Sequence, residues 1–380
     1  MYNILLRNFI LENPDWEEKL TKAPYSLKIS RDSGYIMFKY NQIESDFNIP
    51  LVREARGIIF DEQTWDCVCH AFNKFGNYGE TYCPEIDWNT AIVSEKVDGS
   101  LMKLWYHNKK WHLSTNGTID AKKAQIGDNI IGLSFYDLFC RAIDYMYHCT
   151  FTEFVKDLNK NFTYMFELVS PLNRVVIPYQ ETKIFLLCMR DMTTGEEIGM
   201  DILPHYNICP SPKIYKLNTL NAVVACANEL PWNEEGYVVC DSNFNRIKIK
   251  SPQYVIAHYA RTSGAMTMKR FVEIILQNQV DEFLIYAEDY KDKLLDIQKA
   301  MTGIIKTCNW FTDKAQDTNF ENRKQYALYV KKLPDYAQAF MFKWYDNHQS
   351  FEEYSKNLTT EQWVRLLEKY YGEKNNGTQT

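Results

Sequence analysis

The chain has 380 residues, of which 46% are hydrophobic and 24% are charged, and its formal net charge is −6. These values are ordinary for a soluble globular protein that is long enough for two domains. The negative charge excludes binding to nucleic acid through a bulk positive field, so any such contact must come from local lysine and arginine residues.

The N-terminal stretch MYNILLRNFILENPDW lacks the pattern of a secretion signal, and no run of the sequence is long enough to span a bilayer. Ten cysteines without such a signal indicate free thiols in a reducing compartment. Cys67, Cys69 and His70 alternate as residues of a strand do, and no second Cys/His pair stands at zinc spacing. We therefore do not predict a metal site there.

Up to about residue 255 the sequence is typical of short strands separated by turns. The runs are rich in β-branched and aromatic residues, and several alternate apolar with polar positions. One helix is expected over residues 133–149, where apolar residues are spaced by three and four. The expected strands cover residues 34–40, 56–60, 91–97, 100–106, 164–169, 183–190, 236–240 and 246–250.

After about residue 260 the hydrophobic period becomes helical, as in the spacing of Leu294, Ile297 and Met301. Thr359 is followed three residues later by Gln362, which is the pattern of a capping box at a helix start. The C-terminal third is therefore expected to be an all-helical domain of about five helices.

The stretch SEKVDGSLMKLW places Lys96 at a strand end, directly before a turn at Asp98 and Gly99. A lysine amine is a nucleophile only when neutral, yet its reference pKa is about 10.4. A site that uses such an amine needs burial or neighbouring cations, and those cations would also neutralise a nucleotide phosphate. This chemistry predicts basic residues on adjacent strands and one or two carboxylates for Mg²⁺.

Residues of both kinds are present in or beside the expected strands. The bases are Arg56, Lys74, Lys248 and Lys250, and the acids are Glu167 and Glu235. Each one alone has an ordinary explanation: a K-x-D-G sequence arises by chance about one time in ten in such a chain, and alternating lysines usually form the wet face of an edge strand. A carboxylate in an apolar strand, however, is costly unless it is paired or binds a ligand. The ordered series is far more specific than any one member.

This series resembles the motifs of the covalent nucleotidyltransferases, which include polynucleotide ligases and mRNA capping enzymes. The matching segments, in order, are KVDG (96–99), FELVSPLNRVVIPYQ, EEGYVV and IKIK, which are similar to motifs I, III, IV and V. ARGIIF, NKFGN and FNRIKIKSPQYV resemble one branch in order and spacing, the type-1 RNA ligases of phage tRNA repair. The similarity covers the chain from about residue 35 to 260.

The resemblance implies an α+β fold in two domains. Residues 1–258 would form an adenylyltransferase domain of ATP-grasp-like antiparallel sheets with helices. Residues 259–380 would form the all-helical C-terminal domain. DNA ligases and capping enzymes instead follow motif V with an OB-fold, which would read as five further short strands.

The resemblance also implies roles for individual residues. Lys96 matches the lysine that becomes adenylylated, Asp98 would orient the following turn, and Gly99 would permit close backbone approach. Glu235 matches an acid near the catalytic metal, and Tyr254 a tyrosine needed for ligation. Asp281 matches a metal-linked aspartate through a one-residue gap. The residues that match the ATP-contacting set are Tyr40, Arg56, Lys74, Glu167, Lys248 and Lys250.

The sequence departs from the family pattern at two positions. Asn116 stands where relatives carry a basic residue before glycine, which puts one phosphate contact in doubt. Gly76 stands where an aromatic residue is frequent. Neither position touches the lysine chemistry.

The implied activity is ATP-dependent sealing of single-stranded RNA through a lysyl-AMP and an RNA-adenylate, with Mg²⁺, or Mn²⁺ in its place. The implied partner is a pair of RNA ends such as a nicked tRNA anticodon loop, and the protein would be a monomer of the cytoplasm, of the host if viral. Within enzymes the alternatives are a guanylyltransferase or a DNA ligase. The alternative from another class is a catalytically inactive RNA-binding module.

Overall fold

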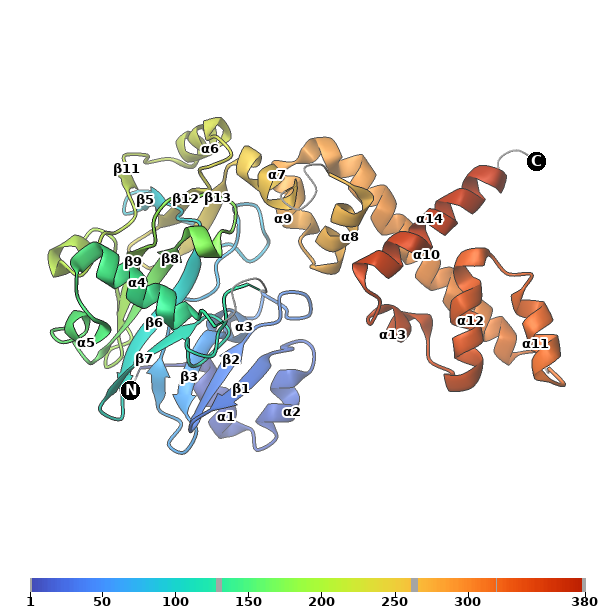
Figure 1. Ribbon diagram of the computed structural model, residues 1–380, viewed down its shortest axis with the longest axis horizontal. Helices are drawn as coiled ribbons and strands as arrows, with labels where there is room; N and C mark the ends of the chain where they lie inside the picture. The colour runs from blue at the N-terminus through green and yellow to red at the C-terminus, as the bar shows by residue number, and fades with distance from the viewer. Residues whose placement is uncertain (1, 128–131, 261–265, 319, 378–380) are drawn as a thin grey trace. The chain divides into compact units, whose positions relative to one another are not determined.

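The computed structural model describes residues 2–127, 132–260, 266–318 and 320–377 (Figure 1). The chain divides into two compact units, Met1–His258 and Tyr259–Thr380, which are described separately here. No helix of the described residues is both long and apolar enough to cross a membrane.

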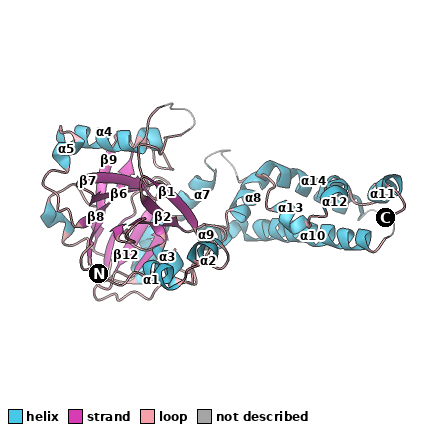
Figure 2. Cartoon of the chain, turned by 90° about the horizontal axis from the view of Figure 1, so that it is seen from below, coloured by secondary structure: helices cyan, strands magenta, loops and turns pink. Residues whose placement is uncertain are grey.

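The first unit is built on three antiparallel sheets, drawn in magenta in Figure 2. The first sheet has the order β1 (Lys28–Asp32), β2 (Tyr35–Lys39), β3 (Arg56–Asp61) and β4 (Cys67–Cys69). The second has the order β10 (Glu197–Ile198), β9 (Lys183–Asp191), β8 (Phe162–Val169), β6 (Ser100–His107) and β7 (Lys110–Thr115). The third has the order β11 (Ile214–Tyr215), β5 (Ile92–Glu95), β12 (Gly236–Cys240) and β13 (Arg246–Lys250).

Seven α-helices accompany these sheets in the part of the chain that the structure describes. They are α1 (Leu5–Glu12), α2 (Trp16–Thr21), α3 (Pro50–Glu54), α4 (Phe135–Tyr147), α5 (Phe151–Phe154), α6 (Leu220–Glu229) and α7 (Pro252–Ala260). Short 3₁₀ turns cover Pro171–Asn173 and Leu203–Tyr206. The helix expected over residues 133–149 is α4, which Ser134 begins with a capping box to Asp137.

Alternation within the strands decides which face of each sheet is covered. In the second sheet, Met102 and Leu104 of β6 share a buried cluster with Leu138 and Phe139 of α4. The first sheet buries Phe38 and other residues of one face in a cluster that includes side chains of α1 to α3. Each fully buried apolar side chain of this kind contributes about 1.5 to 3 kcal/mol relative to exposure.

One face of the third sheet packs against α6. Ile247 and Ile249 of β13 pack in one cluster with Val223 and Ala227 of that helix. Because side chains alternate along a strand, Arg246, Lys248 and Lys250 project from the opposite face, as the sequence predicted for the two lysines. This opposite face is the one that borders the cavity described below.

The second unit is helical throughout its described residues. Its α-helices are α8 (Met268–Leu276), α9 (Val280–Tyr286), α10 (Lys291–Gln316), α11 (Arg323–Val330), α12 (Asp335–Asn347), α13 (Phe351–Ser355) and α14 (Thr360–Gly377), with a 3₁₀ turn over Glu288–Tyr290. The expected capping box is present, since the backbone N–H of Thr359 donates to Gln362 Oε1 at 2.8 Å and the N–H of Gln362 donates to Thr359 Oγ1 at 3.3 Å. The expectation of about five helices was too low, because short helices such as α13 carry too few residues to show a period.

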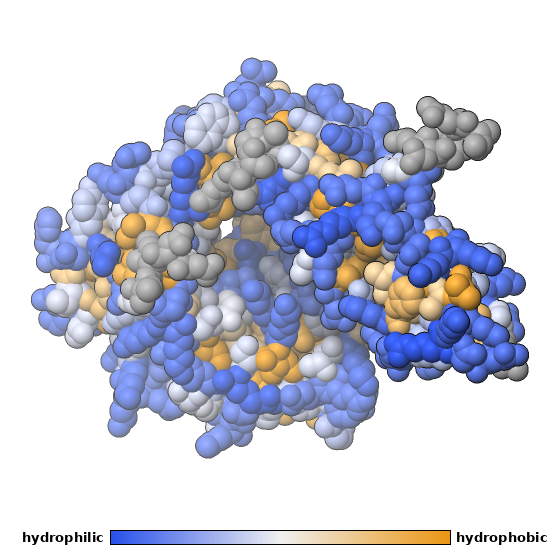
Figure 3. All heavy atoms as spheres, turned by 45° about the vertical axis from the view of Figure 1, so that its right-hand side comes forward, coloured by the Kyte–Doolittle hydropathy of each residue, from blue (hydrophilic) through white to orange (hydrophobic). Residues whose placement is uncertain are grey.

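The α+β class and the antiparallel sheets agree with the prediction, and the described residues of the second unit contain no strand of the kind an OB-fold requires. The strands β12 and β13 have the predicted limits. The other expected strands differ from the structure by one or two residues at an end, and the difference that matters for the site is in the strand expected over 91–97, which ends at Glu95, so Lys96 stands just beyond it. Hydrophilic side chains cover most of the face seen in Figure 3, which fits a chain with a charged fraction of 24%.

Candidate active site

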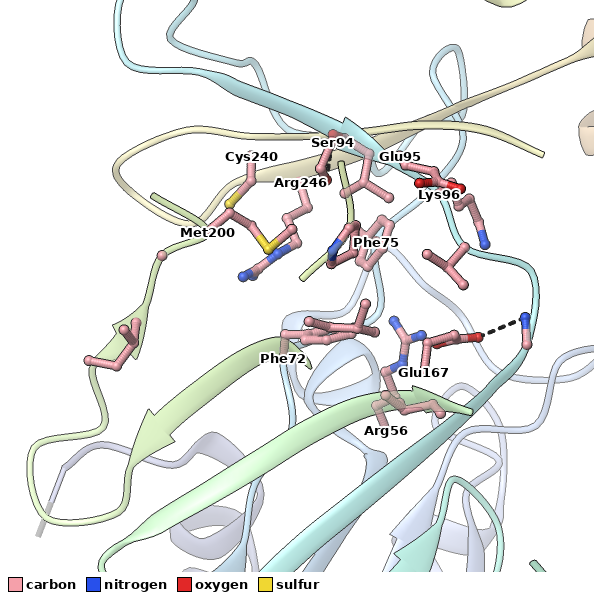
Figure 4. Close-up of a pocket in the computed structure, with 18 of the residues that line it drawn as sticks. Arg56, Phe72, Phe75, Ser94, Glu95, Lys96, Glu167, Met200, Cys240 and Arg246 are labelled. Carbon is pink, nitrogen blue, oxygen red and sulfur yellow. Dashed lines mark hydrogen bonds between the residues drawn. The ribbon is translucent and has the colours of Figure 1, made fainter. Parts of the chain in front are cut away.

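A cavity of about 280 Å³ lies between the second and third sheets of the first unit (Figure 4). The third sheet contributes Ser94, Val238 and Arg246, and the second sheet contributes Leu101 and Glu167. The predicted site residues that line it are Arg56, Lys96, Gly99 and Glu167, together with Asn116.

Lys96 is held at this cavity by the end of β5. Its backbone N–H donates to the carbonyl of Gly236 at 2.8 Å, which continues the pairing of β5 with β12 past the strand limit. Its Nζ atom lies 2.8 Å from Glu235 Oε2, and the side chain is 21% exposed. Lys250 Nζ lies 3.8 Å from the other oxygen of the same carboxylate. The structure thus brings three predicted residues together, with an acid rather than a cation as the nearest charged partner of Lys96.

Glu235 owes its position to the glycine that follows it. Gly236 has a φ of +136°, and a Cβ there would lie 2.2 Å from the carbonyl oxygen of Ile249, so only glycine fits between β12 and β13. Glu235 is 5% exposed, and its Oε2 atom has no hydrogen-bond partner despite the short distance to Lys96. A buried carboxylate oxygen with unused lone pairs suits a hard divalent cation.

Glu167 lies on β8 on the other side of the cavity. Its Oε1 atom accepts the backbone N–H of Gly99 at 3.1 Å, which is the dashed line in Figure 4. Burial raises the pKa of this carboxyl to about 7, although Lys96 and Arg56 act in the opposite direction. Glu167 is therefore a group whose charge changes close to neutral pH.

The raised pKa of Glu167 predicts a pH-dependent stability. Between pH 4.5 and about 7 the folded protein binds this proton more tightly than the unfolded chain, so the free energy of unfolding falls as pH rises. This group should change the free energy of unfolding by up to about 3 kcal/mol over that pH range, and Glu167→Gln should remove the change, as measured by urea unfolding at several pH values. The exposed Glu229→Gln is the matched control, and equal slopes for Glu167→Gln and wild type would contradict the assignment.

The turn after Lys96 is packed against β8. A Cβ on Gly99 would lie 2.5 Å from the carbonyl oxygen of Leu168 and 3.0 Å from Glu167 Cγ. We expect Gly99→Ala to lower the free energy of unfolding by about 1 to 3 kcal/mol because the added methyl forces two backbones apart. Gly303→Ala in α10 is the control, since its Cβ would meet no atom closer than 3.5 Å. Equal free energies of unfolding for the two variants in a denaturant titration would refute the predicted clash at Gly99.

Asp98 and Tyr254 support the site from behind. Asp98 Oδ2 accepts the backbone N–H groups of Val176 and Ile177 at 2.9 and 2.8 Å, and its Oδ1 accepts the hydroxyl of Tyr254 at 2.8 Å. Both side chains are buried, and neither lines the cavity. These bonds tie the turn after Lys96 to the 174–177 segment and to α7.

Arg56 and Asn116 face the same cavity. The Arg56 guanidinium lies 4.7 Å from the ring centroid of Phe72 and 5.3 Å from that of Phe75, in cation–π geometry. The Nε atom of Arg56 and the Oδ1 atom of Asn116 are both buried without a hydrogen-bond partner. Two such polar atoms at one cavity indicate that a ligand completes their hydrogen bonding.

Lys74 and Tyr40 are not brought to the cavity of Lys96. Lys74 Nζ lies over the rings of Phe47 and Tyr40, at 4.4 and 5.1 Å from their centroids. Lys74 lines a neighbouring cavity of about 500 Å³, which shares Phe75 and Arg246 with the first. The sequence grouped these residues in one ATP-contacting set, but Arg56 and Glu167 line the first cavity, Lys74 lines the second, and the other members of the set line neither.

Two further predicted residues lie apart from the cavity lining. Lys248 occupies the same face of β13 as Lys250, and its backbone N–H donates to the carbonyl of Gly76 at 3.0 Å. A Cβ on Gly76 would lie 2.5 Å from Glu80 Oε2 and 2.8 Å from Cys83 Sγ, so these side chains would have to move to admit the aromatic residue frequent at this position. Asp281 is an exposed residue of α9 in the second unit, and its metal role stays a prediction.

The sequence reasoning missed three buried basic residues: Arg190 and Arg246, which share Glu197, and Lys103. Glu197 pairs with Arg190 at 2.6 Å and with Arg246 at 2.5 Å, and all three side chains are at most 10% exposed. Lys103 of β6 is fully buried and donates to the carbonyl of Gly57, and burial lowers its pKa to about 8. A signal existed for two of the three, because Arg246 shares the alternation of Lys248 and Lys250, and Lys103 interrupts the apolar strand after Lys96.

A family model described as RNA ligase matches residues 54–254, which is more than half of the chain and contains most of the site described above. The chain belongs to the RNA ligase family. The matched region includes Lys96, Glu167 and Glu235 together with both lysines of β13.

Several relatives of this RNA ligase family member are known by sequence. It is 29% identical to a putative bifunctional polynucleotide kinase/RNA ligase of Autographa californica nuclear polyhedrosis virus, over 72% of this chain and 40% of that protein. It is 28% identical to a putative RNA ligase of Thermovibrio ammonificans, over 65% of this chain and 64% of that protein. It is 22% identical to an RNA ligase of Rhodothermus phage RM378, over 86% of this chain and 88% of that protein. The chain therefore spans less than two thirds of the length of the first two relatives.

Proposed function

We propose that this protein is an ATP-dependent RNA ligase that joins a 3′-hydroxyl end to a 5′-phosphate end of RNA. The observation that carries the proposal is that Lys96 lines a cavity of about 280 Å³, with its amine 2.8 Å from the buried carboxylate of Glu235 and with the half-buried Glu167 in the same lining. Membership of the RNA ligase family supports the same reading.

In the first step the neutral amine of Lys96 attacks the α-phosphorus of ATP. A P–N bond forms, the bond to the β-phosphate oxygen breaks, pyrophosphate leaves, and the amine loses its proton. Arg56 in the cavity wall and Lys250 beside Glu235 supply positive charge for the phosphate oxygens. The adenylate then passes to the 5′-phosphate of one RNA end, and the 3′-hydroxyl of the other end displaces AMP.

Glu235 and Glu167 are the residues proposed to hold a divalent cation, Mg²⁺ or Mn²⁺, and Asp281 is a further candidate ligand. The fit rests on the buried carboxylate of Glu235, whose ion pair with Lys96 leaves other oxygen lone pairs for a cation. A cation bound there would neutralise phosphate charge in the transition state. Glu235 also holds the amine of Lys96 in an ion pair, which must open before the amine reaches phosphorus.

The RNA partner is proposed to be a pair of single-stranded ends, such as those of a nicked tRNA anticodon loop. RNA of this kind is recognised by shape and by splayed bases, and the helical second unit offers a separate surface for it. We further propose that the protein acts as a monomer in the cytoplasm.

The proposal is tested by sealing of a 5′-phosphorylated single-stranded RNA with ATP or GTP as the nucleotide. ATP with Mg²⁺ or Mn²⁺ should give a sealed product and a labelled protein, and chelation of the metal should abolish both. Labelling from GTP alone would identify a guanylyltransferase and contradict the proposal. Sealing of DNA but not RNA ends would identify a DNA ligase, and RNA binding without labelling would identify an inactive binding module.

A further inference from the structure

Arg246 stands at the end of the cavity away from Lys96. It begins β13 and faces the cavity from the third sheet, next to Cys240, its partner in the strand register. Figure 4 shows Lys96 and Arg246 on opposite sides of Phe75. A ligand whose phosphate meets Lys96 therefore extends towards Arg246.

Buried partners fix the Arg246 side chain in one orientation. Its Nη2 atom lies 2.5 Å from Glu197 Oε2, and the guanidinium lies 5.1 Å from the ring centroid of Phe72. Arg190 holds the other oxygen of Glu197 at 2.6 Å, so the acid is itself fixed. A side chain that is already ordered loses little conformational entropy when a ligand binds.

The guanidinium keeps donor capacity for a ligand. It carries five N–H groups and no acceptor. Its hydrogen bonds to the described residues go to Glu197, to Cys188 Sγ at 3.7 Å and to the carbonyl of Phe244 at 3.4 Å, and they do not use all five. Arg246 therefore presents donors, and no acceptor, to the cavity.

The walls at this end suit the faces of a nucleobase. They include Phe75, Leu187, Met200 and Val238, which are apolar. Glu95 and Glu167 of the described lining lie towards Lys96 in Figure 4, Arg56 lies over the rings of Phe72 and Phe75, and Arg246 lies on the side of Phe75 away from Lys96. A planar ring held between apolar walls would thus meet a fixed donor at its edge.

We propose that Arg246 donates a hydrogen bond to an acceptor nitrogen on the edge of the purine ring of ATP and so helps to select the nucleotide. This inference rests on the proposed function, since it concerns the same cavity. Loss of one acceptor opposite a buried charged donor leaves that donor unpaired, which should weaken binding by about tenfold or more.

The test compares ATP with 1-deaza-, 3-deaza- and 7-deaza-ATP, each of which lacks one ring acceptor, in the initial rate of AMP-adduct formation. For the wild-type protein, the apparent KM for at least one analogue should be about ten times the KM for ATP. Arg246→Met should bring the ratio of the KM for this analogue to the KM for ATP close to one, and it should raise the KM for ATP itself. Arg246→Lys keeps the positive charge beside Glu197 but not the planar fork, and it should also lose the ratio.

Arg190→Met is the matched control, because Arg190 shares Glu197 but does not line this cavity. It should keep the wild-type ratios even if it lowers stability. The role of Arg246 would be overturned if the ratio of the KM for an analogue to the KM for ATP were the same in wild type and both Arg246 variants. It would also be overturned if the wild-type protein had the same KM for ATP and all three analogues. Failure of wild type to form any adduct with ATP would instead refute the proposed function.

Discussion

Lys96→Ala should abolish both the AMP adduct and the sealing of RNA, with a loss of about four orders of magnitude or more in rate. The reason is that no bond to adenylate phosphorus forms without the amine, and removal of a covalent nucleophile is among the costliest single changes to an enzyme. Single-turnover sealing of a 5′-phosphorylated RNA with ATP measures the effect.

The control is Lys110→Ala, which removes an exposed lysine at the start of β7. It should leave the rate unchanged. Supplying a pre-adenylylated RNA to the Lys96→Ala protein should restore part of the sealing, because the last step does not need the amine as a nucleophile. Sealing by Lys96→Ala with ATP at the wild-type rate would contradict the mechanism.

Glu197→Gln is expected to have the largest effect on stability. The carboxylate holds two buried arginines, and its removal leaves both cations without a counter-charge. Loss of one partner from such a buried group should lower the free energy of unfolding by about 3 to 5 kcal/mol, as measured by denaturant titration at neutral pH.

Its exposed neighbour, Glu196→Gln, is the control and should change stability little. The effect also has a pH signature. Burial alone would raise the pKa of Glu197, but Arg246 and Arg190 outweigh it and lower the pKa, so the stabilisation is present above the usual carboxyl range and is lost in acid. A Glu197→Gln protein as stable as wild type at neutral pH would show that the triad contributes nothing.

The sequence predicted those parts of the fold that have a clear period. β12 and β13 were predicted with their observed limits because β13 alternates basic with apolar residues and β12 is a short run of aromatic and β-branched residues that begins at a glycine. The two-residue strands β10 and β11 were missed because they are too short to alternate, whereas the strand-like alternation noted at Cys67 and Cys69 is β4. The sequence placed Lys96 at a strand end but set the limit of the strand two residues too far, since β5 ends at Glu95 although the backbone N–H of Lys96 still bonds to Gly236 of β12.

The site was predictable as a set of residues but not as a geometry. Lys96, Glu235 and Lys250 meet as the ordered motifs implied. Lys74 and Tyr40 come from two separate segments that meet beside Phe47 through long-range packing, and sequence spacing carries no information on that meeting. Glu197 and Arg246 are 49 residues apart, so their pairing was visible only in the folded chain.

The most direct test of the account is the intact mass of the protein after exposure to ATP and Mg²⁺, followed by peptide mapping. We predict a mass increase of one AMP, located on Lys96 and absent when GTP replaces ATP. An unchanged mass, or an adenylate mapped to Lys103, Lys250 or any other residue, would contradict the claim that Lys96 is the nucleophile.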